Sequence, residues 1–181
     1  MLRIAFATLL LLPLTVNARD WTTDAAHSTL GFSGTYQGGP FDGAFKKFEA
    51  TIRYDPDHLA AAKFDVTVET ASVDTQSSER DQTLAGSDFF DTGKFPTAHF
   101  VTTSFRRDAD GGVQAAGTLT IRGSSQPVTL QLNFAATGND ATLDVAATLD
   151  RLDFGLGRGA DWADIGKQVK VHGHLLLHGA P

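Results

Sequence analysis

Most of the chain consists of short segments in which apolar and polar residues alternate. In residues 64–69 (F-D-V-T-V-E), for example, apolar and polar side chains take turns. Because neighbouring side chains of a strand point to opposite faces, such alternation indicates a half-buried β-strand. The same pattern recurs in residues 30–36, 41–54, 98–105, 113–121, 128–134, 141–149 and 169–177.

The segments are separated by turn signals rather than by helical patterns. Residues 38–40 (G-G-P) and 108–112 (D-A-D-G-G) each mark a turn after a strand. Within residues 41–54 the apolar parity changes at Lys46-Lys47, which predicts a bulge or a break in the strand. In residues 98–105 both parities carry apolar side chains, so periodicity does not decide which set points inward.

Short strands joined by tight turns indicate antiparallel pairing. About eight such strands form either a sandwich or a closed barrel. Several positions expected to point inward are small, which would leave space inside: Ala115, Gly117, Ala147 and Gly173. Since a barrel of about eight strands can just enclose one small ligand, we expect an all-β, antiparallel barrel.

Residues 71–100 interrupt the alternation. This stretch is polar and charged at its start and aromatic towards its end. Ser87 can cap a one-turn helix at residues 88–90, because its hydroxyl can accept a hydrogen bond from an otherwise free N–H group. Pro96 favours an extended residue before it. The composition predicts a short helix and loop folded over an opening, as the lid or wall of a cavity.

Residues 1–18 have the pattern of a secretory signal peptide. A basic start at Arg3 is followed by a mostly apolar run over residues 4–16 and by a small-residue cleavage pattern that ends at Ala18. The run is too short to span a bilayer, and no later run is long enough. The alternative is a buried N-terminal helix, which Pro13 would interrupt. We expect residues 19–181 to form a single domain and the signal to lead to a bacterial periplasm.

Charge and composition exclude several classes of function. The formal net charge is −6, which argues against nucleic acid and against anionic membrane surfaces as partners. The chain has no cysteine, so it has neither disulfides nor a thiolate nucleophile. It also lacks a G-x-S-x-G elbow and a convincing phosphate-cradling loop. We therefore expect no enzyme activity and no cofactor.

Five motifs, taken in chain order, resemble those of the YceI-like family of bacterial secreted proteins. They are D-A-A-H-S-T-L-G-F (24–32), S-V-D-T-Q-S-S-E-R-D-Q-T-L (72–84), S-D-F-F-D-T-G-K-F-P-T-A-H-F (87–100), G-T-L-T-I-R-G-S-S-Q-P-V-T-L (117–130) and D-R-L-D-F-G (150–155). Together they cover nearly all of the chain after the signal.

The resemblance implies an extended, antiparallel, lipocalin-like barrel of about eight strands, with a short helical insertion near residues 75–95. It also implies a periplasmic carrier that holds a long-chain polyisoprenoid or a related, fatty-acid-like amphiphile in its pore, without a catalytic role. A transient partner at the inner membrane is compatible with such a role. The alternative is an enzyme or redox accessory protein acting on a bound isoprenoid quinone or lipid.

A lipid pore requires apolar side chains that face a cavity, although the same residues could fill an ordinary core. Each buried CH₂ contributes about 0.8 kcal/mol, so a long tail could hold the ligand while polar groups set its direction. The candidate pore-lining residues are Phe32, Phe64, Val66, Val68, Phe89, Phe90, Phe100, Leu119, Ile121, Leu130, Leu132 and Leu143.

Basic residues near predicted strand ends could meet a phosphate or carboxylate head group, because a planar guanidinium binds such groups in a bidentate manner. Equally, these arginines could pair with Asp81, Asp150 or Asp153 and pin the loops. His27 precedes the first strand and could donate to a head group or cap the turn. The head-group candidates are His27, Arg80, Arg122, Arg151 and Arg158.

Three histidines lie on one face of the last predicted strand: His172, His174 and His178. The H-x-H spacing places two imidazoles side by side, as zinc or copper can use, but a site needs further ligands. Because the opposite face is apolar, we expect these histidines to meet solvent and predict no metal site.

Overall fold

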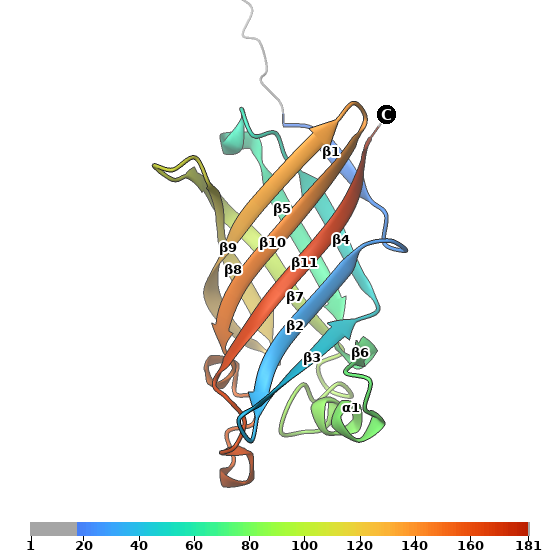
Figure 1. Cartoon of the computed structure of the whole chain (residues 1–181), viewed down its shortest axis with the longest axis vertical. Coiled ribbons are helices and arrows are strands. Elements are labelled where there is room, and N and C mark those ends of the chain that lie inside the picture. The colour runs from blue at the N-terminus through green and yellow to red at the C-terminus, as the bar shows by residue number, and fades with distance from the viewer. Residues whose placement is uncertain (1–17, 181) are drawn as a thin grey trace, which may run out of the picture.

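The computed structural model describes residues 18–180, and its strands form a closed antiparallel barrel with a short helical insertion (Figure 1). The ring closes where Trp21 pairs with both Ile52 and Gly179. In this part of the chain the ring contains, in spatial order, β1 (Asp20–Thr23), β4 (Phe48–Arg53), β5 (Lys63–Glu69), β7 (Thr97–Arg107), β8 (Val113–Ile121), β9 (Ser124–Thr137), β10 (Asp140–Asp150) and β11 (Gln168–Gly179).

Three further strands extend the wall at one end of the barrel. β2 (Thr29–Tyr36) pairs with β11 below the point where β1 pairs with it, so the two strands share one edge of β11. β3 (Gly39–Phe45) pairs with β2, and β6 (Val73–Asp74) pairs with β3. The break between β3 and β4 falls at Lys46-Lys47, as the change of parity predicts.

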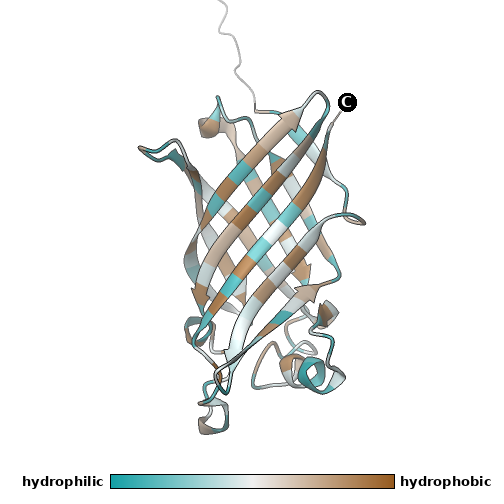
Figure 2. Ribbon diagram, viewed as in Figure 1, coloured by the Kyte–Doolittle hydropathy of each residue, from teal (hydrophilic) through white to brown (hydrophobic). Residues whose placement is uncertain are grey.

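Alternation along the strands builds the wall, and it is visible as alternating bands of hydropathy (Figure 2). β7 contains the one segment whose inward face the sequence leaves open. The pairing of β7 with β8 shifts register between Thr102 and Ser104. Because this bulge changes the parity, Ala98 and Phe100 are buried before it, while Phe105 packs into the interior after it.

The insertion is a helix, α1 (Ser78–Ala85), followed by turns. Ser77 caps it by accepting a hydrogen bond from the Arg80 backbone N–H at 3.4 Å, and Glu79 in the first turn favours the positive end of the helix dipole. The predicted one-turn helix at residues 88–90, capped by Ser87, is wrong. Those residues form turns, because the helix has already ended at Gly86. The other short helices are η1 (Leu59–Ala61), η2 (Thr70–Ser72), η3 (Arg151–Phe154) and η4 (Ala160–Trp162).

The half of the barrel that lies away from α1 is filled by aromatic rings. The Tyr54 ring lies 4.9 Å from that of Phe134 and 5.7 Å from that of Phe64, and the Phe64 ring lies 5.0 Å from that of Phe105. Trp21 joins this group and donates its indole N–H to the Tyr54 carbonyl at 2.9 Å. We call these five residues the aromatic plug.

Small inward residues at mid-barrel accommodate large neighbours instead of leaving a void. A Cβ atom at Gly117 would lie 2.6 Å from the Phe100 ring, and one at Gly173 would lie 2.9 Å from Val145. Such separations are shorter than van der Waals contact, so these positions are already occupied by their neighbours. The barrel prediction is confirmed, but the reason given for it from small residues is wrong at these two positions.

Among the described residues, no helix combines the length and the apolar character needed to cross a membrane. The predicted signal peptide, residues 1–18, lies outside the described residues except for Ala18.

Candidate functional site

An apolar cavity of about 460 Å³ occupies the end of the barrel where α1 and the 151–166 loop lie (Figure 1). Its walls come from β2, β3, β8, β10 and β11, from α1, from the turns that follow α1 and from the 151–166 loop. The lining residues are Phe32, Tyr36, Phe41, Phe45, Ser77, Glu79, Arg80, Thr83, Leu84, Phe89, Phe90, Ile121, Leu149, Arg151, Phe154, Leu156, Trp162, Ile165, Val169 and Val171. The insertion therefore forms a wall of a cavity, as the sequence predicts.

Aromatic rings from the insertion meet rings from the barrel and the far loop. Phe90 packs edge-on against Phe45 with 5.7 Å between ring centroids, and Phe89 packs edge-on against Trp162 at 5.0 Å. The Asp88 carboxylate fixes Trp162 by accepting from its indole N–H at 3.0 Å. These contacts connect two segments that are far apart in the sequence.

Gly157 allows the 151–166 loop to press against the insertion. Its φ of +59° lies in the left-handed region, and a Cβ atom there would lie 2.8 Å from the Phe89 ring and 2.9 Å from Arg151 Nη1. Its N–H donates to the Asp88 carbonyl at 2.6 Å. Only glycine meets both the backbone and the space requirement.

Arg151 holds the same loop from inside. It is buried, and its Nε, Nη1 and Nη2 donate at 2.6–3.1 Å to five backbone carbonyls, those of Leu156, Gly157, Trp162, Ile165 and Gly166. Burial lowers the pKa of its guanidinium, and the charge of Asp150 opposes that shift. With five N–H groups and five acceptors, its donors are already used within the protein.

Arg80 differs from Arg151 because part of its guanidinium has no partner among residues 18–180. Its Nε donates to Thr75 Oγ1 at 2.9 Å and its Nη2 to the Thr75 carbonyl at 3.1 Å, while its Cζ lies 5.0 Å from the Phe41 ring centroid. Thr75 Oγ1 in turn donates to Asp81 at 2.6 Å. Arg80 thus places a positive charge on the wall of an apolar cavity.

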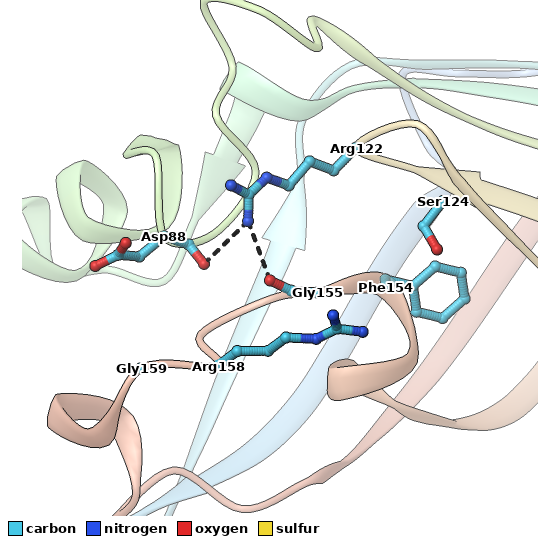
Figure 3. Close-up of a pocket in the computed structure, with 7 residues that line it drawn as sticks. All are labelled: Asp88, Arg122, Ser124, Phe154, Gly155, Arg158 and Gly159. Carbon is cyan, nitrogen blue, oxygen red and sulfur yellow. Dashed lines mark hydrogen bonds between the residues drawn. The ribbon is translucent and has the colours of Figure 1, made fainter.

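A second, polar pocket of about 470 Å³ lies beside the cavity (Figure 3). It is lined by Asp88, Arg122, Ser124, Phe154, Gly155, Arg158 and Gly159, and it shares Phe154 with the cavity. Arg122 Nη1 donates to the Gly155 carbonyl at 3.0 Å. Arg158 donates from Nε and Nη2 to the Leu152 carbonyl at 3.0 and 2.7 Å.

The predicted pore-lining residues fall into four groups. Phe32, Phe89, Phe90 and Ile121 line the cavity. Val68 and Leu119 pack against the buried cluster that surrounds it, whereas Phe64, Leu132 and Leu143 lie in the core around the aromatic plug. Phe100 is buried, and Val66 and Leu130 are half-buried, without reaching the cavity.

Several cavity residues were missed by the sequence reasoning. Leu149, Val169 and Val171 share the inward parity of their strands, so parity could have identified them. Leu156, Trp162 and Ile165 lie in an irregular loop, where no periodic signal exists.

Histidines lie on the outside of the barrel, and all of those in residues 18–180 except the exposed His172 contact an aspartate. His27 contacts Asp24 at 2.8 Å and is exposed, away from the cavity lining. The other pairs are His58–Asp55, His99–Asp65, His174–Asp144 and His178–Asp140, at 2.5–2.8 Å. Within residues 18–180 no group of three or more His, Asp or Glu side chains is arranged to hold a metal ion.

Known proteins are similar to this chain in sequence and in fold. A UPF0312 protein of Shewanella denitrificans is 37% identical over 134 residues, which cover 72% of this chain and 70% of that protein. A UPF0312 protein of Vibrio vulnificus is 35% identical over 137 residues, covering 74% and 72%. The protein YceI of Escherichia coli is 40% identical over 111 residues, covering 61% and 54%.

Among solved structures, BcnA of Burkholderia cenocepacia superposes with a TM-score of 0.80 and 29% identity, covering 85% of this chain and 98% of that one. A polyisoprenoid binding domain from Saccharophagus degradans superposes with a TM-score of 0.70 at 16% identity, covering 88% and 98%, and shares the fold. The YceI-like domain matches residues 21–177. The chain therefore belongs to the YceI-like family.

Proposed function

We propose that this protein is a periplasmic carrier, not an enzyme, that holds the chain of an isoprenoid or a similar amphiphile in the cavity beside α1. The observation that carries the proposal is the cavity itself, which is apolar, bounded by aromatic rings and of the size used for small-molecule ligands, about 300–1,000 Å³. The description of the Saccharophagus domain as polyisoprenoid binding supports the same class of ligand.

The aromatic plug limits how far a ligand can reach. Tyr54 and Phe64 are each 1% exposed, and their rings fill the half of the barrel that lies away from α1. A bound chain therefore enters beside α1 and stops near mid-barrel. A longer chain would have to leave its remainder outside or displace the plug, so affinity should stop rising once the cavity is full.

Arg80 gives the ligand a direction. A guanidinium on an apolar wall, with donors unused by residues 18–180, favours an anionic head group at the α1 end. Asp81 is one hydrogen bond removed through Thr75, and Glu79 also borders the cavity. The head group is therefore met by Arg80 while the chain lies among the aromatic rings.

The test is displacement of a neutral fluorescent probe, N-phenylnaphthylamine, by prenyl alcohols of increasing length and by the matching prenyl phosphates. Thr83→Trp places a large ring in the cavity wall and should weaken probe binding about tenfold or more. Gln82→Trp, at the exposed neighbouring position on α1, is the matched control and should bind as the unsubstituted protein does. Arg80→Gln should remove the preference for phosphates over alcohols.

A protein that takes up no probe and no prenyl alcohol would refute the carrier proposal. Equal loss of binding in Thr83→Trp and Gln82→Trp would show that binding takes place elsewhere. Native mass spectrometry of protein purified from the host would then identify any cargo it carries.

A further inference from the structure

The polar pocket beside the cavity brings together three segments that are distant in sequence. Asp88 comes from the insertion, Arg122 from the turn between β8 and β9, Ser124 from the start of β9, and Arg158 from the loop after β10. Figure 3 shows the two arginine side chains running in opposite directions across the pocket. The Asp88 carboxylate already accepts from the Trp162 indole N–H at 3.0 Å.

Neither arginine in this pocket is neutralised by a carboxylate. Within residues 18–180, no carboxylate oxygen lies within 4.0 Å of the Arg122 or the Arg158 guanidinium, and the partners of both are backbone carbonyls. By contrast, Arg53 pairs with Asp20 at 2.7 Å and Arg106 with Asp108 at 3.4 Å on the barrel surface. Two uncompensated positive charges therefore face one concave site.

The backbone at Arg122 is unfavourable for an arginine. Ile121 pairs with Ser124, so Arg122 and Gly123 are the two central residues of a hairpin turn, with φ of +51° and +74°. Asn-Gly or Asp-Gly are preferred in such a turn, because the left-handed region is costly for longer side chains. Strain of this kind is characteristic of functional positions.

The carbonyl contacts hold each guanidinium in place and leave an edge open. Arg122 uses Nη1 for the carbonyls of Gly155 and Asp88, at 3.0 and 3.5 Å, so its parallel Nε–H and Nη2–H remain without a partner in the described chain. Arg158 uses Nε and Nη2, so its Nη1 remains. A parallel pair of N–H groups matches the two oxygens of a phosphate or carboxylate.

We propose that this pocket is an oxyanion-binding site for a phosphate or phosphate ester, with Arg122 as the bidentate ligand and Arg158 as the second cation. Asp88 sits at one side of the site and limits its net positive charge, which suits a small anion better than a polyanion. The site stands apart from the proposed carrier function, because its ligands are outside the cavity lining and it needs no lipid tail.

The experiment titrates the purified protein with inorganic phosphate and follows the arginine Nε–H signals by nuclear magnetic resonance, with calorimetry for affinity. The signals of Arg122 and Arg158 should shift, while that of Arg106 should not. Arg122→Asn should weaken phosphate binding about ten- to a hundredfold. Asparagine fits the left-handed turn, which offsets the lost bond to the Gly155 carbonyl, so the unfolding free energy of this variant should stay close to that of the unsubstituted protein. Arg158→Gln should also weaken binding, and Arg106→Gln is the control.

Two results would refute the proposed site: unchanged phosphate affinity in Arg122→Asn, or equal shifts of all arginine signals.

To identify the source of the anion, an alkyl phosphate is compared with the matching alcohol while N-phenylnaphthylamine fills the cavity. Displacement of the probe only by the phosphate, and only with Arg122 present, assigns the site to a lipid head group. Phosphate binding that leaves the probe in place assigns it to a free oxyanion. If the protein binds the probe but no phosphate, only the oxyanion site is refuted. If it binds phosphate but neither the probe nor a prenyl alcohol, only the carrier function is refuted.

Discussion

Replacing Arg151 by lysine separates a structural role from a ligand-binding role. The guanidinium serves five carbonyls, and three of these belong to cavity-lining residues: Leu156, Trp162 and Ile165. Lysine keeps the charge but offers three donors from a single atom. At least two carbonyls of the loop must therefore lose their donor.

The size of the loss follows from these bonds. A hydrogen bond to a charged group contributes about 1.5–3 kcal/mol, so the loss of two such bonds destabilises the protein by at least about 3 kcal/mol. For a chain of this length, a loss of about 3 kcal/mol lowers the Tm by about 6–12 °C, and a larger loss lowers it further. Arg158→Lys is the matched control, because this arginine of the same loop is exposed and bonds a single carbonyl. We expect it to change stability by less than about 0.5 kcal/mol.

The assay combines urea unfolding with ligand displacement at a temperature where both variants are folded. We expect Arg151→Lys to unfold at lower urea and to weaken prenyl alcohol and prenyl phosphate by the same factor, because the cavity wall loosens as a whole. A variant as stable as the unsubstituted protein that loses only prenyl phosphate would refute this reasoning. It would instead establish Arg151 as a head-group ligand.

Three further changes test other parts of the structure. Gly157→Ala should lower the unfolding free energy by about 2 kcal/mol or more in urea unfolding, because its Cβ meets the Phe89 ring in a left-handed backbone. The hydrogen bond that the Asp65 carboxylate accepts from His99 at 2.8 Å holds the pKa of that carboxyl below its usual value. Its stabilising effect is present above about pH 4 and is lost as the pH falls through the lowered pKa, so Asp65→Asn should flatten the acid side of the stability profile. Ser77→Ala should destabilise α1 by about 1 kcal/mol and speed proteolysis there.

Each of these has a clear contrary result. Wild-type stability in Gly157→Ala would mean that the loop does not press on the insertion. If Asp65→Asn and the unsubstituted protein show the same dependence of unfolding free energy on acid pH, the His99 contact does not stabilise the fold. Asp57→Asn, at an exposed position, is the control. Unchanged cleavage within residues 78–85 in Ser77→Ala would show that the cap is dispensable.

The strands could be predicted from the sequence because the alternation of apolar and polar residues is a local signal. The division of the interior into plug and cavity could not, because Phe64 and Ile121 have the same inward parity and differ only in what surrounds them. The predicted helix at residues 88–90 lies just past Gly86, where α1 ends, whereas the structure places the helix before that glycine, with Ser77 as its cap. The role of Arg151 could not be predicted either, because its acceptors are backbone carbonyls, and every residue type carries one.

The closure of the ring has a consequence for how the chain reaches its native state. β1 pairs with β11, with Trp21 opposite Gly179, so the seam joins the first and the last strand of residues 18–180. Contacts of such long sequence separation slow folding, because the entropy of closing the intervening chain is lost before any stabilisation is gained. In a nascent chain without β11, the edges of β1 and β10 are unpaired, and Trp21 is not enclosed by the barrel wall. Such an intermediate is vulnerable to aggregation and to proteases until β11 has been synthesised and has paired.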